Sequence, residues 1–129
     1  AYRNSKLKRD AVKCAILSAE MKLSNGDPAK IQERMRSFIQ KRKDTQPPGA
    51  SMGSMFKNPE GDHAGRLIEA AGLKGTRIGN AEISAVHANF FVNHGETKAS
   101  DVKALIELTQ KTVFEKFGIQ LELEIEIVA

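Results

Sequence analysis

The stretch VHANFFVN, residues 86–93, is typical of a β-strand, because its residues alternate between two faces. One face would carry Val86, Ala88, Phe90 and Val92, and the other His87, Asn89, Phe91 and Asn93. A second strand is expected at residues 78–84, directly before it. After it, apolar residues recur at helical spacing from Ser100, the expected N-cap, to Gly118, the expected end of the helix.

Further elements are predicted on both sides of this unit. Residues 121–127 alternate Leu or Ile with Glu and predict one more strand. Upstream, a short strand is expected around residues 55–57, followed by a helix that Asp62 caps and Gly72 ends. Residues 53–128 are therefore predicted to run strand-helix-strand-strand-helix-strand. This order indicates an α+β fold, a small sheet packed with helices.

The first 49 residues predict one strand and one helix before that layer. Residues 12–23 carry apolar side chains on both faces, as a strand buried on both sides does. Asp27 followed by Pro28 predicts a helix start, and apolar residues at helical spacing continue to about Lys43. The segment QPPG, residues 46–49, ends this helix, so we divide the chain into residues 1–49 and 50–129.

Composition excludes several classes of protein. The 129 residues are 40% hydrophobic and carry 20 basic against 16 acidic side chains, a net charge of +4. This charge is too weak for a nucleic-acid stripe, and no apolar run approaches the roughly 20 residues of a membrane-spanning helix. The single cysteine, Cys14, permits no internal disulfide and suits a reducing cytoplasm. The chain begins with Ala rather than Met, so we expect it to be a fragment of a longer protein.

Individual polar residues indicate little chemistry by themselves. The three histidines have no cysteine or carboxylate at ligand spacing, so no metal site is predicted. The segment GLKG, residues 72–75, has the form of an RNA-clamping loop, but a helix end followed by a turn explains it better. Taken alone, Ser54 is a turn hydroxyl, Glu124 part of a solvated row of carboxylates, and His87 a surface residue.

Several longer motifs together resemble one family. They are GSMFKNP (residues 53–59), AGRLIEAAGLKG (64–75), IGNA (78–81) and HANFFVN (87–93). These closely resemble the C-terminal, substrate-binding domain of UDP-N-acetylenolpyruvoylglucosamine reductases, also called UDP-N-acetylmuramate dehydrogenases. These flavoenzymes act in bacterial peptidoglycan precursor synthesis, in the cytoplasm. The similarity continues through FGI (117–119) and LELEI (121–125), and reaches back to QP (46–47) and YRNS (2–5).

The resemblance implies a reaction and two catalytic residues. NADPH would reduce FAD, and the enolpyruvyl ether of UDP-N-acetylglucosamine would be reduced to UDP-N-acetylmuramate. Ser54, the serine of the Gly-Ser-x-Phe motif, would protonate the carbon next to the site of hydride addition. Glu124, in the final Leu-Glu-x-Glu pattern, would stabilise the developing enolate, and its pKa should then be raised.

The resemblance also implies substrate contacts and a missing partner. Asn58 and His87 would bind substrate, Tyr2 and Arg3 would lie near the UDP group, and a cation for the phosphates could come from residues 42–43. FAD would be bound mostly by a flavin-binding domain before Tyr2, of which residues 1–49 would be the end. The fragment alone would then be inactive and could self-associate. The alternative is a free-standing module that binds a nucleotide sugar or RNA without catalysis.

Overall fold

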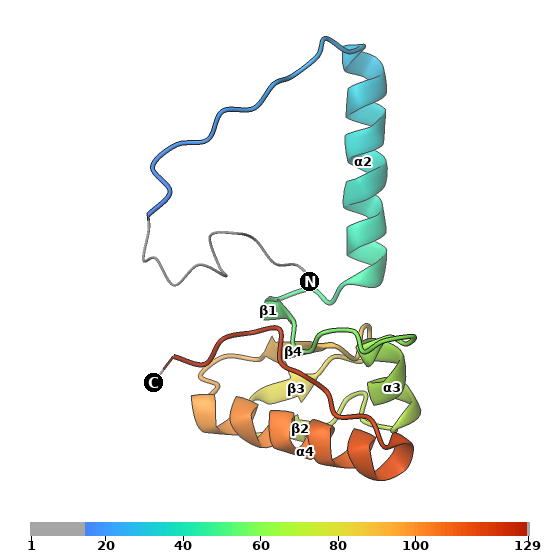
Figure 1. The fold of residues 1–129 in the computed structure, drawn as a ribbon, viewed down its shortest axis with the longest axis vertical. Helices are drawn as coiled ribbons and strands as arrows, with labels where there is room; N and C mark the ends of the chain where they lie inside the picture. Colours follow the sequence, from blue (N-terminus) through green and yellow to red (C-terminus); the bar gives the residue numbers. More distant parts are fainter. Residues whose placement is uncertain (1–14, 129) are drawn as a thin grey trace.

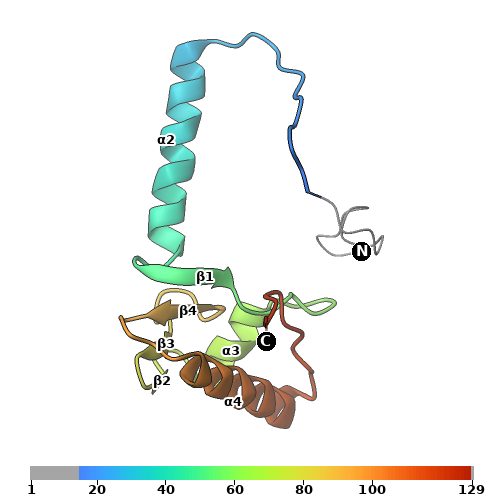
Figure 2. The same ribbon diagram turned by 90° about the vertical axis from the view of Figure 1, so that its left-hand side faces the viewer.

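The structure, a computed structural model, describes residues 15–128, and its first regular element is a long helix. Helix α2 (Pro28–Thr45) begins as predicted, because the Asp27 carboxylate accepts a hydrogen bond of 2.9 Å from the Ala29 backbone N–H. It ends at Gln46, just before the two prolines. The helix stands away from the sheet (Figures 1 and 2), and none of its residues is buried.

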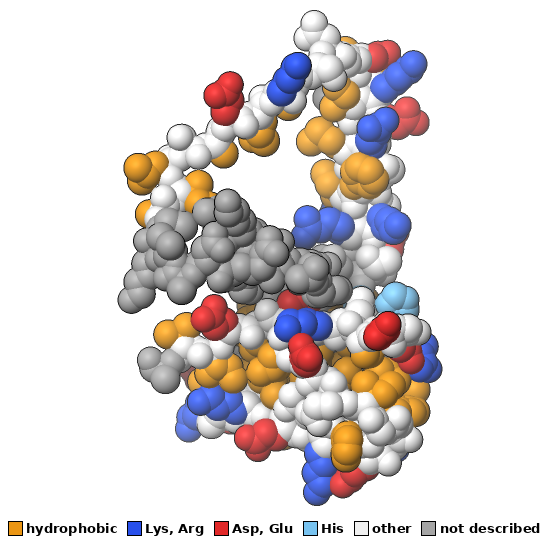
Figure 3. Space-filling model, in the orientation of Figure 1, with side chains coloured by type: hydrophobic (Ala, Val, Ile, Leu, Met, Phe, Trp, Pro, Cys, Tyr) orange, Lys and Arg blue, Asp and Glu red, His pale blue; other side chains and the backbone are white. Residues whose placement is uncertain are grey.

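The strand predicted at residues 12–23 is wrong where the structure describes it. Residues 15–23 have no regular secondary structure, and residues 12–14 lie outside the described part. A strand needs a hydrogen-bonding neighbour, and the described residues offer this segment none. Its large apolar side chains are therefore exposed: Ile16, Leu17, Met21 and Leu23. Apolar side chains also line α2 on the side turned toward this segment (Figure 3).

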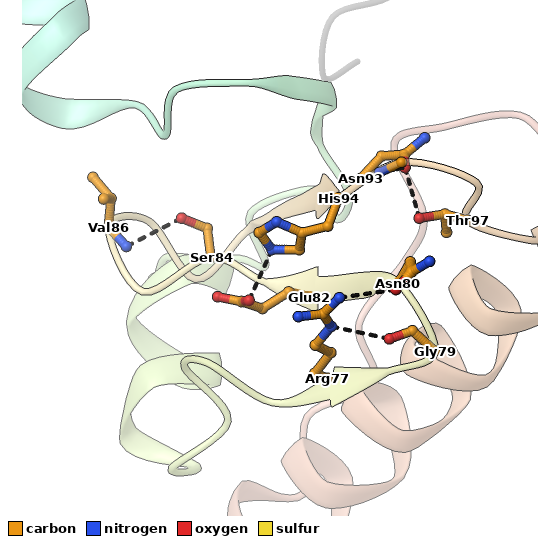
Figure 4. Close-up of polar contacts among 10 residues, drawn as sticks. Arg77, Gly79, Asn80, Glu82, Ser84, Val86, Asn93, His94 and Thr97 are labelled. Carbon is orange, nitrogen blue, oxygen red and sulfur yellow. Dashed lines mark hydrogen bonds and ion pairs between the residues drawn. The ribbon is translucent and has the colours of Figure 1, made fainter.

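Four short antiparallel strands form the sheet, in the order β1-β4-β3-β2. They are β1 (Ala50–Ser54), β2 (Arg77–Ile78), β3 (Ala81–Ile83) and β4 (Phe90–Asn93). The strand predicted at 78–84 is in fact a hairpin, since the chain turns at residues 79–80 between β2 and β3. Arg77 holds this turn by donating to the Gly79 carbonyl and to Asn80 Oδ1 (Figure 4).

Two helices complete the layer. Helix α4 (Ala99–Phe117) packs against β2, β3 and the shorter α3 (Ala64–Ala70). Gly72 and Gly118 adopt left-handed backbone angles, φ +82° and +68°, so both predicted helix ends are confirmed. The predicted N-caps are wrong: His63 rather than Asp62 precedes α3, and Lys98 rather than Ser100 precedes α4.

The core lies between the sheet and these two helices. Its largest fully buried apolar side chains come from α3, α4, β3 and the segments that follow β1 and α4: Met55, Phe56, Leu67, Ile68, Ile83, Leu105, Val113 and Leu121. The predicted α+β class is thus confirmed, but the order of elements differs. The strand expected around residues 55–57 lies earlier, as β1, and three strands rather than two separate α3 from α4.

The final strand predicted at 121–127 forms only in part. Leu123 makes an isolated antiparallel bridge with Phe56, flanked by hydrogen bonds from Lys57 N to the Glu122 carbonyl (2.8 Å) and from Glu124 N to the Met55 carbonyl (2.9 Å). The inward alternation holds for Leu121, which is buried, but Ile127 is half exposed. The segment runs back from the end of α4 across the molecule (Figure 1) and docks beside residues 55–57.

Candidate functional site

A cleft of about 440 Å³ opens where the end of β1, helix α3 and the β3–β4 loop meet. It is lined by Ser54, Asn58, His63, Gly65, Arg66, Glu69, Val86, His87, Ala88 and Asn89. Three of the predicted site residues, Ser54, Asn58 and His87, therefore share one cleft. Glu124 does not line it, and Tyr2 and Arg3 lie outside the described residues.

Ser54 is the last residue of β1 and is partly buried. The pairing of β1 with β4 is irregular between Ser51 and Ser54, and Gly53 has a left-handed φ of +81°. A side chain at residue 53 would be strained at this angle, which favours glycine there. The Gly-Ser step thus bends the strand immediately before the hydroxyl and directs the chain from the sheet into the core.

Asn89 is the site residue that the strand pattern misplaced. Residues 86–89 belong to the β3–β4 loop, and Asn89 is only 4% exposed. Its side-chain oxygen accepts a hydrogen bond from Phe56 N (2.9 Å), and its side-chain nitrogen donates to the Phe56 carbonyl (2.8 Å). Its own carbonyl accepts from Met55 N (2.8 Å). Asn89 therefore binds the two residues that follow Ser54, 33 positions earlier in the chain.

Glu124 reaches the same segment from the other side. Its backbone N–H donates to the Met55 carbonyl, so Met55 is bonded to Asn89 through its N–H and to Glu124 through its carbonyl. The Glu124 side chain is partly buried, whereas Glu122 is exposed and forms an ion pair with Lys57 at 3.0 Å. The glutamates of the predicted row are thus not equivalent, and the Glu124 backbone is tied to the residue after Ser54.

His87 is held by contacts on three sides. Its Nδ1 accepts a hydrogen bond from Asn89 N (3.2 Å), and its ring centroid lies 4.9 Å from that of Phe90. Helix α3 approaches the ring so closely that a Cβ at Gly65 would lie 3.0 Å from His87 Cε1. Because Nδ1 is the acceptor, the proton of a neutral ring is on Nε2, which is then a hydrogen-bond donor at the cleft.

Ser84 shapes the loop that carries this histidine. Its hydroxyl oxygen accepts hydrogen bonds from Val86 N (3.1 Å) and His87 N (3.2 Å), the first of which is drawn in Figure 4. In this serine turn the buried Ser84 hydroxyl provides a hydrogen-bond acceptor for both loop amides. The same figure shows His94 beside Glu82, an ion pair of 2.8 Å if His94 is protonated.

Asn58 links the cleft to helix α3. Its side-chain oxygen accepts a hydrogen bond of 3.1 Å from Ala64 N, the first residue of the helix. Among the described residues, no hydrogen bond is recorded for its side-chain nitrogen, which leaves a donor at the cleft. The residue thus combines a structural role at the helix start with a donor that a ligand could use.

One strong ion pair lies at the rim of the cleft. The Asp62 carboxylate accepts hydrogen bonds from the Arg66 guanidinium and from His63 N. These contacts, the Arg66 hydrogen bond above all, lower the pKa of Asp62 to about 2, and the same pair raises the pKa of Arg66. Arg66 therefore brings a permanent positive charge to the cleft, partly neutralised by its neighbour.

At each helix start among the described residues a side chain accepts from one backbone N–H, and these residues form no metal site. A dinucleotide pyrophosphate binds the free amides at a helix N-terminus. Here, at each helix start between residues 15 and 128, a side-chain oxygen already accepts from a backbone N–H: Asp27 for Ala29, Asn58 for Ala64 and Asp101 for Lys98. The same part of the chain contains no group of three side chains that could hold a metal ion.

None of the helices between residues 15 and 128 is both long and apolar enough to span a bilayer.

Comparison with known proteins gives matches that include the residues of this cleft. Residues 40–128 match the family model of the UDP-N-acetylenolpyruvoylglucosamine reductase C-terminal domain. UDP-N-acetylenolpyruvoylglucosamine reductases from Chloroflexus aggregans and Chloroflexus aurantiacus are 50% and 49% identical to this chain and cover 99% and 98% of it. The chain spans 44% of the length of each of these two relatives.

A solved structure agrees with these relatives. The crystal structure of UDP-N-acetylenolpyruvylglucosamine reductase from Thermus caldophilus superimposes with a TM-score of 0.69 at 45% identity. That match covers 81% of this chain and 37% of the other. With the family model spanning most of the chain, including every residue of the cleft, this chain belongs to the UDP-N-acetylenolpyruvoylglucosamine reductase family.

Proposed function

We propose that the protein carrying this chain reduces the enolpyruvyl ether of UDP-N-acetylglucosamine to UDP-N-acetylmuramate in the bacterial cytoplasm. In this proposal residues 50–129 are the substrate-binding domain, and residues 1–49 are the end of a flavin-binding domain. FAD and NADPH would supply the reducing equivalents from outside the described residues. The observation that carries the proposal is the meeting of Ser54, Asn58 and His87 in one cleft of a chain that belongs to this family.

Ser54 is assigned to the proton transfer. When hydride adds to the vinyl carbon, the neighbouring carbon takes on carbanion character and must gain a proton. A hydroxyl is a weak acid in water, but a hydroxyl held against a strongly basic carbon can transfer its proton. The bent end of β1 provides such a hydroxyl, since hydrogen bonds to Asn89 on one side and to residues 122 and 124 on the other hold the residues that follow it.

Glu124 is assigned to the developing enolate. Its backbone bond to Met55 keeps it within one residue of the Ser54 segment. A carboxyl group stabilises an enolate beside a carboxylate only when it is protonated or bridged by another donor. In this role the partly buried Glu124 differs from the solvent-exposed Glu122.

Substrate binding is assigned to donors at the cleft. The side-chain nitrogen of Asn58 and the Nε2 proton of His87 suit the oxygens of an anionic nucleotide sugar, and Tyr2 and Arg3 would bind near its UDP group. Arg66 adds a positive charge at the rim. The alternative of an RNA-binding module has no specific observation in its favour, since GLKG forms a helix end and a turn.

The test is direct. The full-length protein is incubated with NADPH and the enolpyruvyl ether, and the products are separated by mass. We expect a nucleotide sugar that has gained two hydrogens, formed in step with NADPH oxidation. Binding of the nucleotide sugar without any such product would instead support a binding module and contradict the reductase.

A further inference from the structure

One buried residue connects the segment after Ser54 with the loop that carries His87. Asn89 bonds through its carboxamide to both the N–H and the carbonyl of Phe56, and through its backbone to Met55 N and His87 Nδ1. Met55 and Phe56 directly follow Ser54, and Met55 is also bonded to Glu124. A single residue thus contacts the segment that carries Ser54, the residue that anchors Glu124, and the ring of His87.

The carboxamide takes the place of a missing strand. One edge of residues 55–57 pairs with residues 122–124 through two backbone hydrogen bonds. At Phe56 no strand of the described residues lies beside the other edge, and the Asn89 side chain supplies the acceptor and the donor that a strand would supply. A carboxamide offers both at once without carrying a charge at any pH.

We propose that Asn89 is a positioning residue, whose carboxamide sets the placement of Ser54 relative to Glu124 during proton transfer. This inference rests on the proposed reductase function. Asn89 lines the cleft but acts through the backbone that follows Ser54, not through its own chemistry. Misplacement of a reacting group by about 1 Å can slow a reaction roughly 100-fold, so a loosened Phe56 should slow protonation.

The test uses Asn89→Asp, because a carboxyl group has nearly the same shape as a carboxamide. When ionised, it can accept from Phe56 N but opposes the Phe56 carbonyl. When protonated, it restores both the acceptor and the donor. The buried position raises the pKa of an introduced carboxyl, so acidification within the range where the protein is folded should restore the native bonds.

Two rate constants are measured on the flavin-loaded, full-length protein: reduction by NADPH, and reoxidation by the enolpyruvyl substrate. At alkaline pH, Asn89→Asp should slow reoxidation by about 10- to 100-fold and leave reduction unchanged. The reoxidation rate constant of Asn89→Asp, divided by that of wild type at the same pH, should return toward one as the pH falls. Because both constants are taken from the flavin-loaded fraction, loss of folded protein lowers the amplitudes and not the rates.

A second readout does not depend on activity. Although the ionised Asp still accepts from Phe56 N, its repulsion of the Phe56 carbonyl should loosen the segment. Hydrogen exchange of the Phe56 amide should therefore be faster in Asn89→Asp than in wild type at the same alkaline pH, and the two rates should become equal on acidification. In a Ser54→Ala background, Asn89→Asp should slow reoxidation no further, because its effect passes through that hydroxyl. The matched control is Asn93→Asp on β4, whose side-chain oxygen only accepts, from Gly95 N and Thr97 Oγ1, and so should be neutral.

The outcomes separate the two proposals. An inactive wild-type protein would overturn the reductase function and this role with it. An active wild type whose Asn89→Asp variant reoxidises normally at every pH would overturn the role alone. Equal slowing of both half-reactions, or an additive effect in the Ser54→Ala background, would likewise reduce Asn89 to a residue of general stability.

Discussion

The substitution Gly65→Ala tests whether helix α3 holds the His87 ring in place. The added Cβ would lie 3.0 Å from His87 Cε1, 3.4 Å from Nδ1 and 3.7 Å from Asn89 Cβ. The first distance is shorter than an ordinary contact, so either the ring or the helix must move by a few tenths of an ångström. The ring is held by Asn89 N and by Phe90, and movement toward either costs a contact.

Two opposing terms set the expected effect on stability. Alanine is more stable than glycine in a helix, by about 0.5–1 kcal/mol in the interior and less in the first turn, where Gly65 lies, whereas overpacking of this kind costs about 1–3 kcal/mol. The site is partly exposed, which favours the lower end of the second range. The free energy of unfolding should therefore fall by less than about 1 kcal/mol.

The effect on substrate binding should be larger. A displaced ring no longer points Nε2–H at the same place in the cleft, and a hydrogen bond to a charged oxygen contributes about 1.5–3 kcal/mol. KM for the nucleotide sugar should rise roughly tenfold or more, with little change in flavin reduction by NADPH. Steady-state kinetics and urea unfolding of the full-length protein measure the two quantities.

Two controls make the result interpretable. His87→Ala should raise KM by a similar factor, and adding Gly65→Ala to it should then have little further effect. Ala70→Gly, at the exposed end of the same helix, should lower stability without changing KM. A Gly65→Ala protein with unchanged KM would refute the reasoning, because it would mean that His87 is not held against the helix or does not bind substrate.

Four further outcomes are expected. Ser54→Ala should slow reoxidation by substrate by at least about 100-fold in rapid-mixing absorbance, while flavin reduction and the control Ser51→Ala stay normal. Glu124→Gln should lower turnover and the exposed Glu122→Gln should not; equal losses would indicate a stability effect of the segment. Wild type should melt at a higher temperature than Asp62→Asn. This difference should be complete above pH 3.8 and shrink as the pH falls toward 2, because folding lowers the pKa of Asp62 from 3.8 to about 2. The isolated chain should be colourless, inactive and prone to self-association through the exposed apolar residues of α2 and segment 15–23, whereas stoichiometric bound FAD would contradict our assignment of the cofactor site.

Local signals in the sequence were sufficient for the three helices. The Asp27-Pro28 pair starts α2, and the glycines at 72 and 118 end α3 and α4, because caps and left-handed turns depend on neighbouring residues alone. Strand formation depends on a partner elsewhere. Residues 15–23 have the apolar pattern of a strand, but no described segment pairs with them. Residues 121–127 form a β-bridge only at Leu123.

For the site, the sequence by itself determined the family and the residues Ser54, Asn58 and His87, since short ordered motifs carry them. Only the tertiary structure decided that they line one cleft and that Glu124 is anchored one residue from Ser54. It also decided the burial and the hydrogen bonds of Asn89, which alternation placed on a polar strand face. A buried carboxamide is stable only with its hydrogen bonds made, and its partner is the backbone of Phe56, which leaves no mark in the pattern of side chains.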